Sequence, residues 1–270
     1  MRPLFSRFML TLALIAALLA MPFGSSRAQS PPVASIGPVS HIVPPPPTYT
    51  FPDETWVYNA EWRIWNAGTV TLGISRVGAE QRVSGTVESS GVISALYPVH
   101  DRFQSVFDPK TFCSLSLHKH SEEGLHKRDT LINYMYPRGK SVLNETNLKN
   151  NETKHVENDI PGCVTDVISG IIYLGTLPLL PDGNYTFPVN DGGKTINVTA
   201  KVEGRETITV PAGTFKTIRV SPESGDNFKL KGKIWIWYTD DERRIPVQMR
   251  GKMFWGPIDF KLTRIETNKK

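Results

Sequence analysis

Thr69-Val70-Thr71-Leu72-Gly73-Ile74-Ser75 is the stretch that decides the fold class, because polar and apolar residues alternate along it one by one. Successive side chains of a β-strand point to opposite faces, so this alternation predicts a strand with one apolar face. The same period of two returns at Ile196, Val198, Ala200 and Val202, at Ile208 and Val210, and at Ile258, Phe260 and Leu262. Glycine- and proline-containing turns separate these segments. They predict an all-β protein, either an antiparallel β-barrel or a strongly curved β-sheet of about a dozen strands.

A single segment has the spacing of a helix instead. Its apolar residues are Val164, Val167, Ile168, Ile171, Ile172 and Leu174. Asp166 near the start is of a type that caps helices, and Pro178 lies beyond the end. Because the apolar side of this segment is broad, we expect one short helix over about residues 163–174 that closes or covers the sheet.

The first residues have the pattern of an export signal. Arg2 and Arg7 form a basic start, residues 8–21 are almost wholly apolar, and Ser26-Arg27-Ala28 supplies small residues for cleavage. We therefore expect a signal peptide over residues 1–28, cleaved near Ala28, and a periplasmic mature protein. No later segment has a comparable apolar run, so we expect no transmembrane segment after cleavage.

Charge and composition divide the rest of the chain. Removal of Arg2, Arg7 and Arg27 lowers the formal net charge from +5 to +2, which does not favour nucleic acid as a partner. Residues 29–53 are rich in proline, which lacks a backbone donor, so we expect a disordered linker there. Residues 54–267 then form a single β domain.

One short loop carries a mixture of chemistry-bearing side chains: Tyr97, His100, Asp101 and Arg102. An imidazole, a carboxylate and a guanidinium together could bind an anion or move a proton. The alternative is a turn at the start of a strand, in which Asp101 caps and Arg102 forms an ion pair. We favour the turn.

Two further clusters raise the question of a metal. Asp240 and Asp241 lie at a strand end with Arg244, but calcium needs about six oxygen ligands, so a charged hairpin turn is the better interpretation. His118, His120 and His126 could hold zinc if two strands brought them together. They lie on the predicted solvent side, which favours a solvated hairpin. We predict no metal site and no cofactor.

The tryptophans are candidates for lining an apolar pocket, and Trp62, Trp235 and Trp237 are the ones we select. The alternative is that they fill the core.

Cys113 and Cys163 are the two cysteines of the chain. Cys113 shares a strand phase with Leu115 and Leu117, which points it inward, and Cys163 begins the helix expected over the same interior. A disulfide is one interpretation, and two separate buried thiols fit the sequence equally well.

Four strings together resemble a known family. They are Leu96-Tyr97-Pro98-Val99-His100-Asp101-Arg102-Phe103; Asp166-Val167-Ile168-Ser169 with Tyr173-Leu174; Val210-Pro211-Ala212-Gly213-Thr214-Phe215; and Thr239-Asp240-Asp241 followed by Arg244-Ile245-Pro246-Val247. Over roughly Trp56 to Thr263 the chain resembles the bacterial exported domain-of-unknown-function family 3108. That family has no established activity, so the resemblance implies no reaction.

Three functional hypotheses follow. The leading hypothesis is a non-catalytic binding or interaction module of the cell envelope, whose partner is a lipid, another amphipathic envelope component or an envelope protein. It rests on the export pattern, on the expected barrel architecture and on the absence of local catalytic motifs from the sequence. The second is a hydrolase that uses His100 and Asp101. The third is a structural partner tethered through the proline-rich segment.

Overall fold

The computed structural model describes residues 41–47, 49–224, 233–253 and 256–268. The predicted signal peptide and residues 29–40 of the predicted linker lie outside these residues. The strands are β1 (Glu54–Trp62), β2 (Trp65–Val77), β3 (Glu80–Ser89), β4 (His100–Phe107), β5 (Ser114–Glu123), β6 (His126–Met135), β7 (Lys140–Asn147), β8 (Thr153–Asp159), β9 (Asn184–Asn190), β10 (Thr195–Val210), β11 (Gly213–Ser224), β12 (Lys233–Thr239), β13 (Pro246–Met253) and β14 (Gly256–Thr267). The helices are α2 (Gly91–Leu96) and α3 (Val167–Thr176). Neither helix of the described residues has the length and apolarity to cross a membrane.

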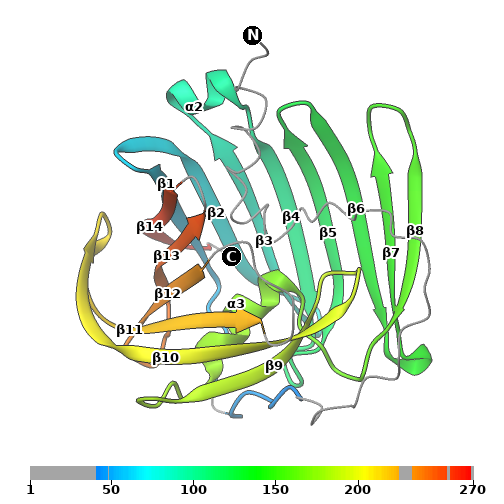
Figure 1. The fold of residues 1–270 in the computed structure, drawn as a ribbon. Helices are drawn as coiled ribbons and strands as arrows, with labels where there is room; N and C mark the ends of the chain where they lie inside the picture. Colours follow the sequence, from blue (N-terminus) through cyan, green and yellow to red (C-terminus); the bar gives the residue numbers. More distant parts are fainter. Residues whose placement is uncertain (1–40, 48, 225–232, 254–255, 269–270) are drawn as a thin grey trace.

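All fourteen strands belong to one antiparallel sheet, in the order β8-β7-β6-β5-β4-β3-β2-β1-β14-β13-β12-β11-β10-β9. The sheet consists of two meanders, β1–β8 and β9–β14, which join where the first strand pairs with the last, for example at Ala60 and Phe260. Figure 1 shows the sheet bending round until β9 and β10 pass beneath β3–β6. The predicted all-β antiparallel fold is confirmed. The sheet is strongly curved, and it is open because its two terminal strands, β8 and β9, do not pair.

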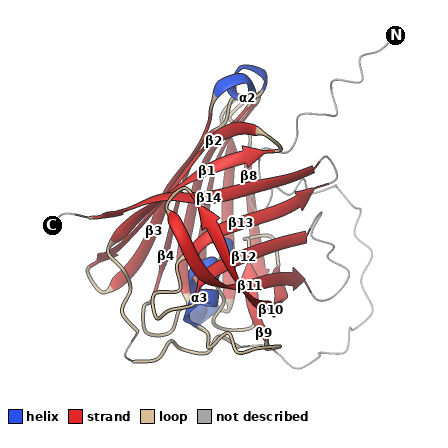
Figure 2. Ribbon diagram, turned by 90° about the vertical axis from the view of Figure 1, so that its left-hand side faces the viewer, coloured by secondary structure: helices blue, strands red, loops and turns tan. Residues whose placement is uncertain are grey.

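Helix α3 lies inside the curve of the sheet, where it packs against β4 and β9 (Figures 1 and 2). Its Ile168, Ile172 and Leu174 are buried in the same cluster as inward-facing strand residues such as Leu117 and Ile258. We call the side of the sheet that faces α3 the concave face and the opposite side the outer face. The core therefore fills the concave face, and the outer face carries most of the polar residues of the strands.

The helix begins later than expected, at Val167, because Asp166 caps it. The Asp166 carboxylate accepts hydrogen bonds from the backbone of Ile168 (2.8 Å) and Ser169 (3.0 Å), which satisfies donors that the first turn leaves unpaired. Its second oxygen accepts from Ser105 of β4 (2.6 Å) and from Ser114 of β5 (2.7 Å). One fully buried carboxylate thus caps α3 and fixes it to two strands.

Cys113 and Cys163 form a disulfide, with their Cα atoms 5.0 Å apart. The bridge joins the segment before β5 to the segment before α3. The expected strand phase is wrong at this point, since a register shift opposite Val106 and Phe107 leaves Leu115 without a partner in β4. As a result Ser114, rather than Leu115, points inward to Asp166.

The end of the predicted disordered linker packs on the domain. Ile42 is buried, and the backbone N–H of Val43 donates to the hydroxyl of Tyr173 on α3 (3.0 Å). The ring of Phe51 contacts the rings of Phe107 and Phe112. The expectation of disorder up to residue 53 is therefore wrong for these positions, because apolar residues among the prolines have core partners.

Candidate functional site

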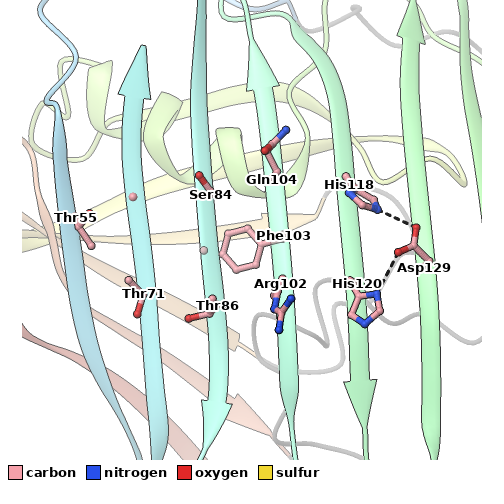
Figure 3. Close-up of a pocket in the computed structure, with 12 residues that line it drawn as sticks. Thr55, Thr71, Ser84, Thr86, Arg102, Phe103, Gln104, His118, His120 and Asp129 are labelled. Carbon is pink, nitrogen blue, oxygen red and sulfur yellow. Dashed lines mark hydrogen bonds and ion pairs between the residues drawn. The ribbon is translucent and has the colours of Figure 1, made fainter. Parts of the chain in front are cut away.

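A polar hollow of about 610 Å³ opens on the outer face of the first meander. Figure 3 shows its lining side chains side by side on β1 to β6. The lining residues are Thr55, Thr71, Gly73, Ser84, Gly85, Thr86, Arg102, Phe103, Gln104, His118, His120 and Asp129. These side chains include hydroxyl, amide, imidazole and guanidinium groups, so the hollow offers hydrogen-bond partners to a polar ligand.

Two glycines shape the floor of the hollow. Gly73 lies opposite Thr55 and Ser84 on the outer face and leaves a gap between them. Gly85 faces the other way, where a Cβ atom would lie 2.4 Å from the ring of Phe103. The Phe103 ring therefore lies over the backbone of Gly85, and a larger residue there would displace it.

Arg102 brings a positive charge to the centre of the hollow. It lies in register with Thr86 of β3 and His120 of β5, so these three side chains form a row across the outer face. Within the described residues the Arg102 side chain has neither a hydrogen bond nor an ion pair, and it is exposed. An exposed guanidinium that has no carboxylate partner is available to an anionic ligand.

His118 and His120 share one carboxylate. His118 Nε2 lies 2.8 Å from Asp129 Oδ1, and His120 Nδ1 lies 3.2 Å from Asp129 Oδ2. The other nitrogen of His120 lies 3.2 Å from Glu122. These hydrogen bonds, first to Asp129 and then to Glu122, raise the pKa of His120. Burial alone would raise the pKa of Asp129, but its bonds to the two imidazoles lower it overall. Both oxygens of Asp129 are thus engaged by imidazoles. Because the pKa of His120 is raised, a moderate fall in pH protonates His120 and adds positive charge to the hollow.

A second ionisable cluster lies on the concave face of the same strands. Asp101 is buried, and its Oδ1 accepts from the backbone N–H of Glu122 (2.9 Å). Burial, and then the negative charge of Glu123, raise the pKa of Asp101 to about 7. Burial also raises the pKa of Glu123. The two carboxyl groups therefore hold a proton near neutral pH, and they join the start of β4 to the end of β5.

Lys119 faces the same side as Asp101, opposite Phe103. Burial lowers its pKa to about 8, against the attraction of Asp191, Glu145, Glu123 and Asp101. Buried ionisable groups with shifted pKa values are frequent at functional sites, but they also occur in structural networks. Here Asp101 and Lys119 are both almost inaccessible, which favours a structural role.

The predicted loop of Tyr97, His100, Asp101 and Arg102 is divided between the two faces. Successive residues of β4 alternate, so Asp101 points into the concave face while His100 and Arg102 point outward. His100 is hydrogen-bonded to Glu88 on the outer face. Tyr97 ends α2 and contributes to the surroundings of Asp101 and Glu123. His100 and Asp101 therefore do not form the acid–base pair that a hydrolase would need.

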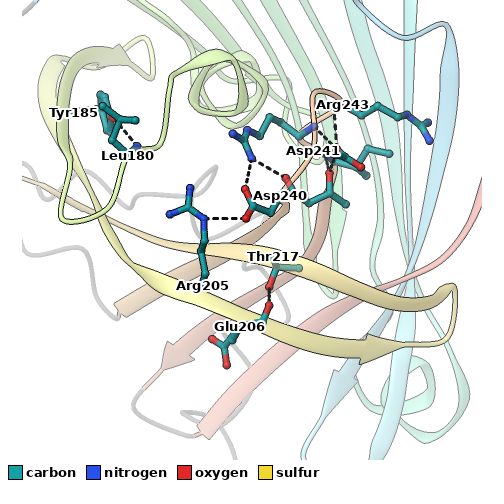
Figure 4. A network of polar contacts seen from close by, with 11 residues as sticks. Leu180, Tyr185, Arg205, Glu206, Thr217, Asp240, Asp241 and Arg243 are labelled. Atoms are coloured by element: carbon teal, nitrogen blue, oxygen red, sulfur yellow. Dashed lines mark hydrogen bonds and ion pairs between the residues drawn. The ribbon is translucent and has the colours of Figure 1, made fainter.

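The strand-end cluster is a network of structural contacts, part of which appears in Figure 4. Asp240 accepts from Arg205 (2.8 Å) and from Arg244 (3.1 Å), and its pKa is lowered by these arginines although burial opposes the change. Asp241 accepts from the Thr239 hydroxyl (2.7 Å) and the backbone N–H of Arg243 (3.0 Å), which closes the turn between β12 and β13. No group of three or more His, Cys, Asp or Glu side chains in the described residues is placed to hold a metal.

The three selected tryptophans do not share a pocket. Trp62 pairs in register with Ile258, a residue of the concave face. Trp235 and Trp237 lie on the outer face, where their indole N–H groups donate to Glu203 (3.1 Å) and Glu206 (2.9 Å). Both faces of β12 are therefore apolar but differ in their surroundings, since Ile236 and Tyr238 lie in the core while Lys233 and Arg250 lie over the rings of Trp235 and Trp237.

Several residues of the hollow were missed by sequence reasoning. His118 and His120 were interpreted as part of a solvated hairpin, and Asp129, Gln104 and Thr86 were not selected. Their common signal is the period of two, because each belongs to the polar phase of a strand. Which of these polar residues lie side by side can be stated only when the strand order and register are known.

Taken together, these features define a class of all-β protein in which one open, strongly curved antiparallel sheet surrounds a helix. A family model described as a protein of unknown function, DUF3108, matches residues 57–263, so the chain belongs to that family. No curated protein matches the chain.

The solved structures that match the chain include the following two. One is the crystal structure of a β-barrel-like protein of a domain of unknown function, DUF1849, from Brucella abortus, with a TM-score of 0.58, 8% identity and coverage of 86% of this chain and 100% of that one. It supports the fold alone. The other is a Bacteroides fragilis protein with a YmcC-like fold, with a TM-score of 0.35, 10% identity and coverage of 84% and 99%.

Proposed function

We propose that the protein is an exported, non-catalytic binding protein of the bacterial cell envelope, and that the outer hollow binds an anionic, hydroxyl-rich envelope component. The observation that carries this proposal is Arg102, an exposed guanidinium that has no ion-pair partner among the described residues and stands in a row of polar side chains. The shared chemistry of the ligand is a phosphate or another anionic group beside hydroxyl groups.

Two features support export. Residues 1–28 have the pattern of a cleaved signal peptide. The disulfide between Cys113 and Cys163 is of a kind that persists in oxidising compartments such as the bacterial periplasm.

A binding role fits the hollow better than catalysis does. Both nitrogens of His120 and Nε2 of His118 are engaged by carboxylates, and among the described residues no hydrogen bond joins either imidazole to Ser84 or Thr86. Activation of a hydroxyl nucleophile requires such a bond to a base. The concave face is filled by core residues and α3, so an acyl chain would have to remain outside it.

The test is binding to the mature protein by titration calorimetry and by co-sedimentation. The probes are inorganic phosphate, glucose 1-phosphate, and vesicles of phosphatidylglycerol with phosphatidylcholine vesicles as the neutral comparison. Arg102→Ala should weaken binding roughly 10- to 100-fold, since a charge-assisted hydrogen bond contributes about 1.5 to 3 kcal/mol. The three anionic probes distinguish a free anion, a sugar phosphate and a lipid headgroup as the source.

Arg76→Ala is the matched control, because Arg76 is an exposed arginine of β2 whose side chain, among the described residues, bonds to the backbone carbonyl of Gly78 and to no carboxylate. It removes the same charge from the same sheet and should leave binding unchanged. Equal loss of binding in both variants would show that net charge alone accounts for binding, and would contradict a site at Arg102. A wild-type protein that binds none of the probes would also contradict the proposal.

A further inference from the structure

The two edges of the open sheet are not alike. Each terminal strand has a row of backbone N–H and C=O groups on its outer side, which can pair with another strand. At β9 this row is partly covered: Thr165 donates to the carbonyl of Pro188 (3.1 Å), and Asn190 donates to the carbonyl of Thr165 (2.8 Å). Pro188 itself has no N–H to offer. The edge at β9 is therefore blocked at the C-terminal end of the strand.

The edge at β8 has no such backbone cover among the described residues. Its contact with the turn between β9 and β10 is made by a side chain, since Asn158 donates to the carbonyl of Gly192 (2.7 Å). The backbone ladder of β8 is made with β7 alone, and no isolated bridge reaches its other side. Five of its seven residues are exposed, and Val156 and Asn158 are half-buried. The contacts of its charged side chains run back toward β7, for example Asp159 with Lys140 (2.7 Å) and Glu157 with Arg138 (3.3 Å). The row of backbone groups on the far side thus remains open to another strand.

The sequence of β8 is complementary to itself. In an antiparallel pair centred on Val156, Thr153 lies opposite Asp159, Lys154 opposite Asn158, and His155 opposite Glu157. This register pairs all seven residues of the strand and places no two like charges directly opposite each other. A register centred on Glu157 would place two carboxylates in contact. The register centred on Val156 also continues the apolar row of the concave face, because Val156 lies beside Leu143.

We propose that two copies of this chain pair antiparallel through β8, so that their sheets become continuous across a two-fold axis at Val156. One strand pair buries less than the roughly 800 Å² per partner of a standard stable interface. The dimer is therefore weak and dissociates on dilution.

Cysteine cross-linking tests the register directly. On the two-fold axis the Cα atoms of the two copies of residue 156 are about 4.5 to 5.5 Å apart, which a disulfide can span. Val156→Cys should therefore give a covalent dimer under mild oxidation. Thr153→Cys is the control: it places an exposed thiol on the same strand, but the two copies of residue 153 are separated by roughly 20 Å along the strands.

Sedimentation velocity over a concentration series tests the pairing without cross-links. The wild type should show a reversible shift toward dimer, and His155→Glu should reduce it by placing a second carboxylate opposite the partner's Glu157. The double substitution His155→Glu with Glu157→Lys restores opposite charges and should recover the dimer. Circular dichroism melting checks that each variant is folded. A wild type that stays monomeric at the highest concentration, or equal cross-linking of Val156→Cys and Thr153→Cys, would overturn the proposal.

Discussion

Asp101 is the residue with the clearest pH-dependent behaviour. Its carboxyl ionises near 3.8 in an unfolded chain, whereas burial and then Glu123 raise its pKa to about 7 in the folded protein. Below the lower value the group is protonated in both states. Between about pH 4 and pH 7 the unfolded state releases the proton first, so the free energy of unfolding falls as the pH rises through this window.

Asp101→Asn should remove this loss, because an amide does not ionise and can still accept from the Glu122 N–H. We expect the variant to be more stable than the wild type at pH 8, by on the order of 1 to 4 kcal/mol, since one pKa unit corresponds to about 1.4 kcal/mol. At pH 4 the difference should vanish. Urea unfolding at both values measures it, with Glu80→Gln on β3 as an exposed control. An equal difference in the free energy of unfolding at pH 4 and at pH 8 would contradict the raised pKa of Asp101.

At the residue scale, the sequence identified several side chains of the site but not the face of the sheet to which each one points. Arg102 and Asp101 were both selected from one string, yet the strand turns one to the outer hollow and the other to the concave face. Lys119 was not selected, although it occupies the apolar phase of β5. A lysine at an inward position is visible in a sequence, but its carboxylate neighbours come from distant strands and are not.

At the scale of elements, Asp166 connects helix α3 to the sheet. Asp166→Ala would remove the carboxylate that accepts from three serine hydroxyls and two backbone N–H groups in the core. An unsatisfied buried group costs about 1 to 3 kcal/mol, so we expect a loss of roughly 3 kcal/mol or more in unfolding free energy. Asp108→Ala removes a carboxylate that bonds the backbone of an exposed turn, and should cost about 1 kcal/mol. Similar losses of unfolding free energy in the two variants would contradict the role of Asp166 in joining α3 to the sheet.

The disulfide is the second link between these elements. Cys113 and Cys163 are 50 residues apart in sequence, so in the chain-entropy description the bridge contributes about 4 kcal/mol. Cys113→Ser with Cys163→Ser should lower the stability by up to that amount, and reduction of the wild type should have the same effect. Denaturant unfolding with and without reductant measures both. An unchanged midpoint after reduction would contradict this stabilising role.

The boundaries of the helices and strands show why the local sequence pattern predicted these elements only in part. Helical spacing located α3 within a few residues, and the capping residue Asp166 was in the predicted segment. The bulge at Leu115 was not predicted, because the alternation of Cys113, Leu115 and Leu117 looks unbroken in the sequence. Tertiary contacts of Ser114 with Asp166 decide the phase there.

At the scale of the molecule, the period of two predicted strands but not their order. The pairing of β1 with β14 joins the ends of the domain and places β8 and β9, which are neighbours in sequence, at opposite edges. Nothing local in Glu54–Trp62 specifies a partner some 200 residues away. The outer hollow is a product of this order, since its lining comes from β1 to β6.

The central claim, an anion-binding hollow on the outer face, is tested most directly by nuclear magnetic resonance of the mature protein during titration with glucose 1-phosphate. We predict saturable shifts of the Arg102 side-chain Nε–H and of the His118 and His120 imidazoles, and none of these shifts in Arg102→Ala. Shifts that map instead to the concave face, or to the outer tryptophans Trp235 and Trp237, would contradict the account.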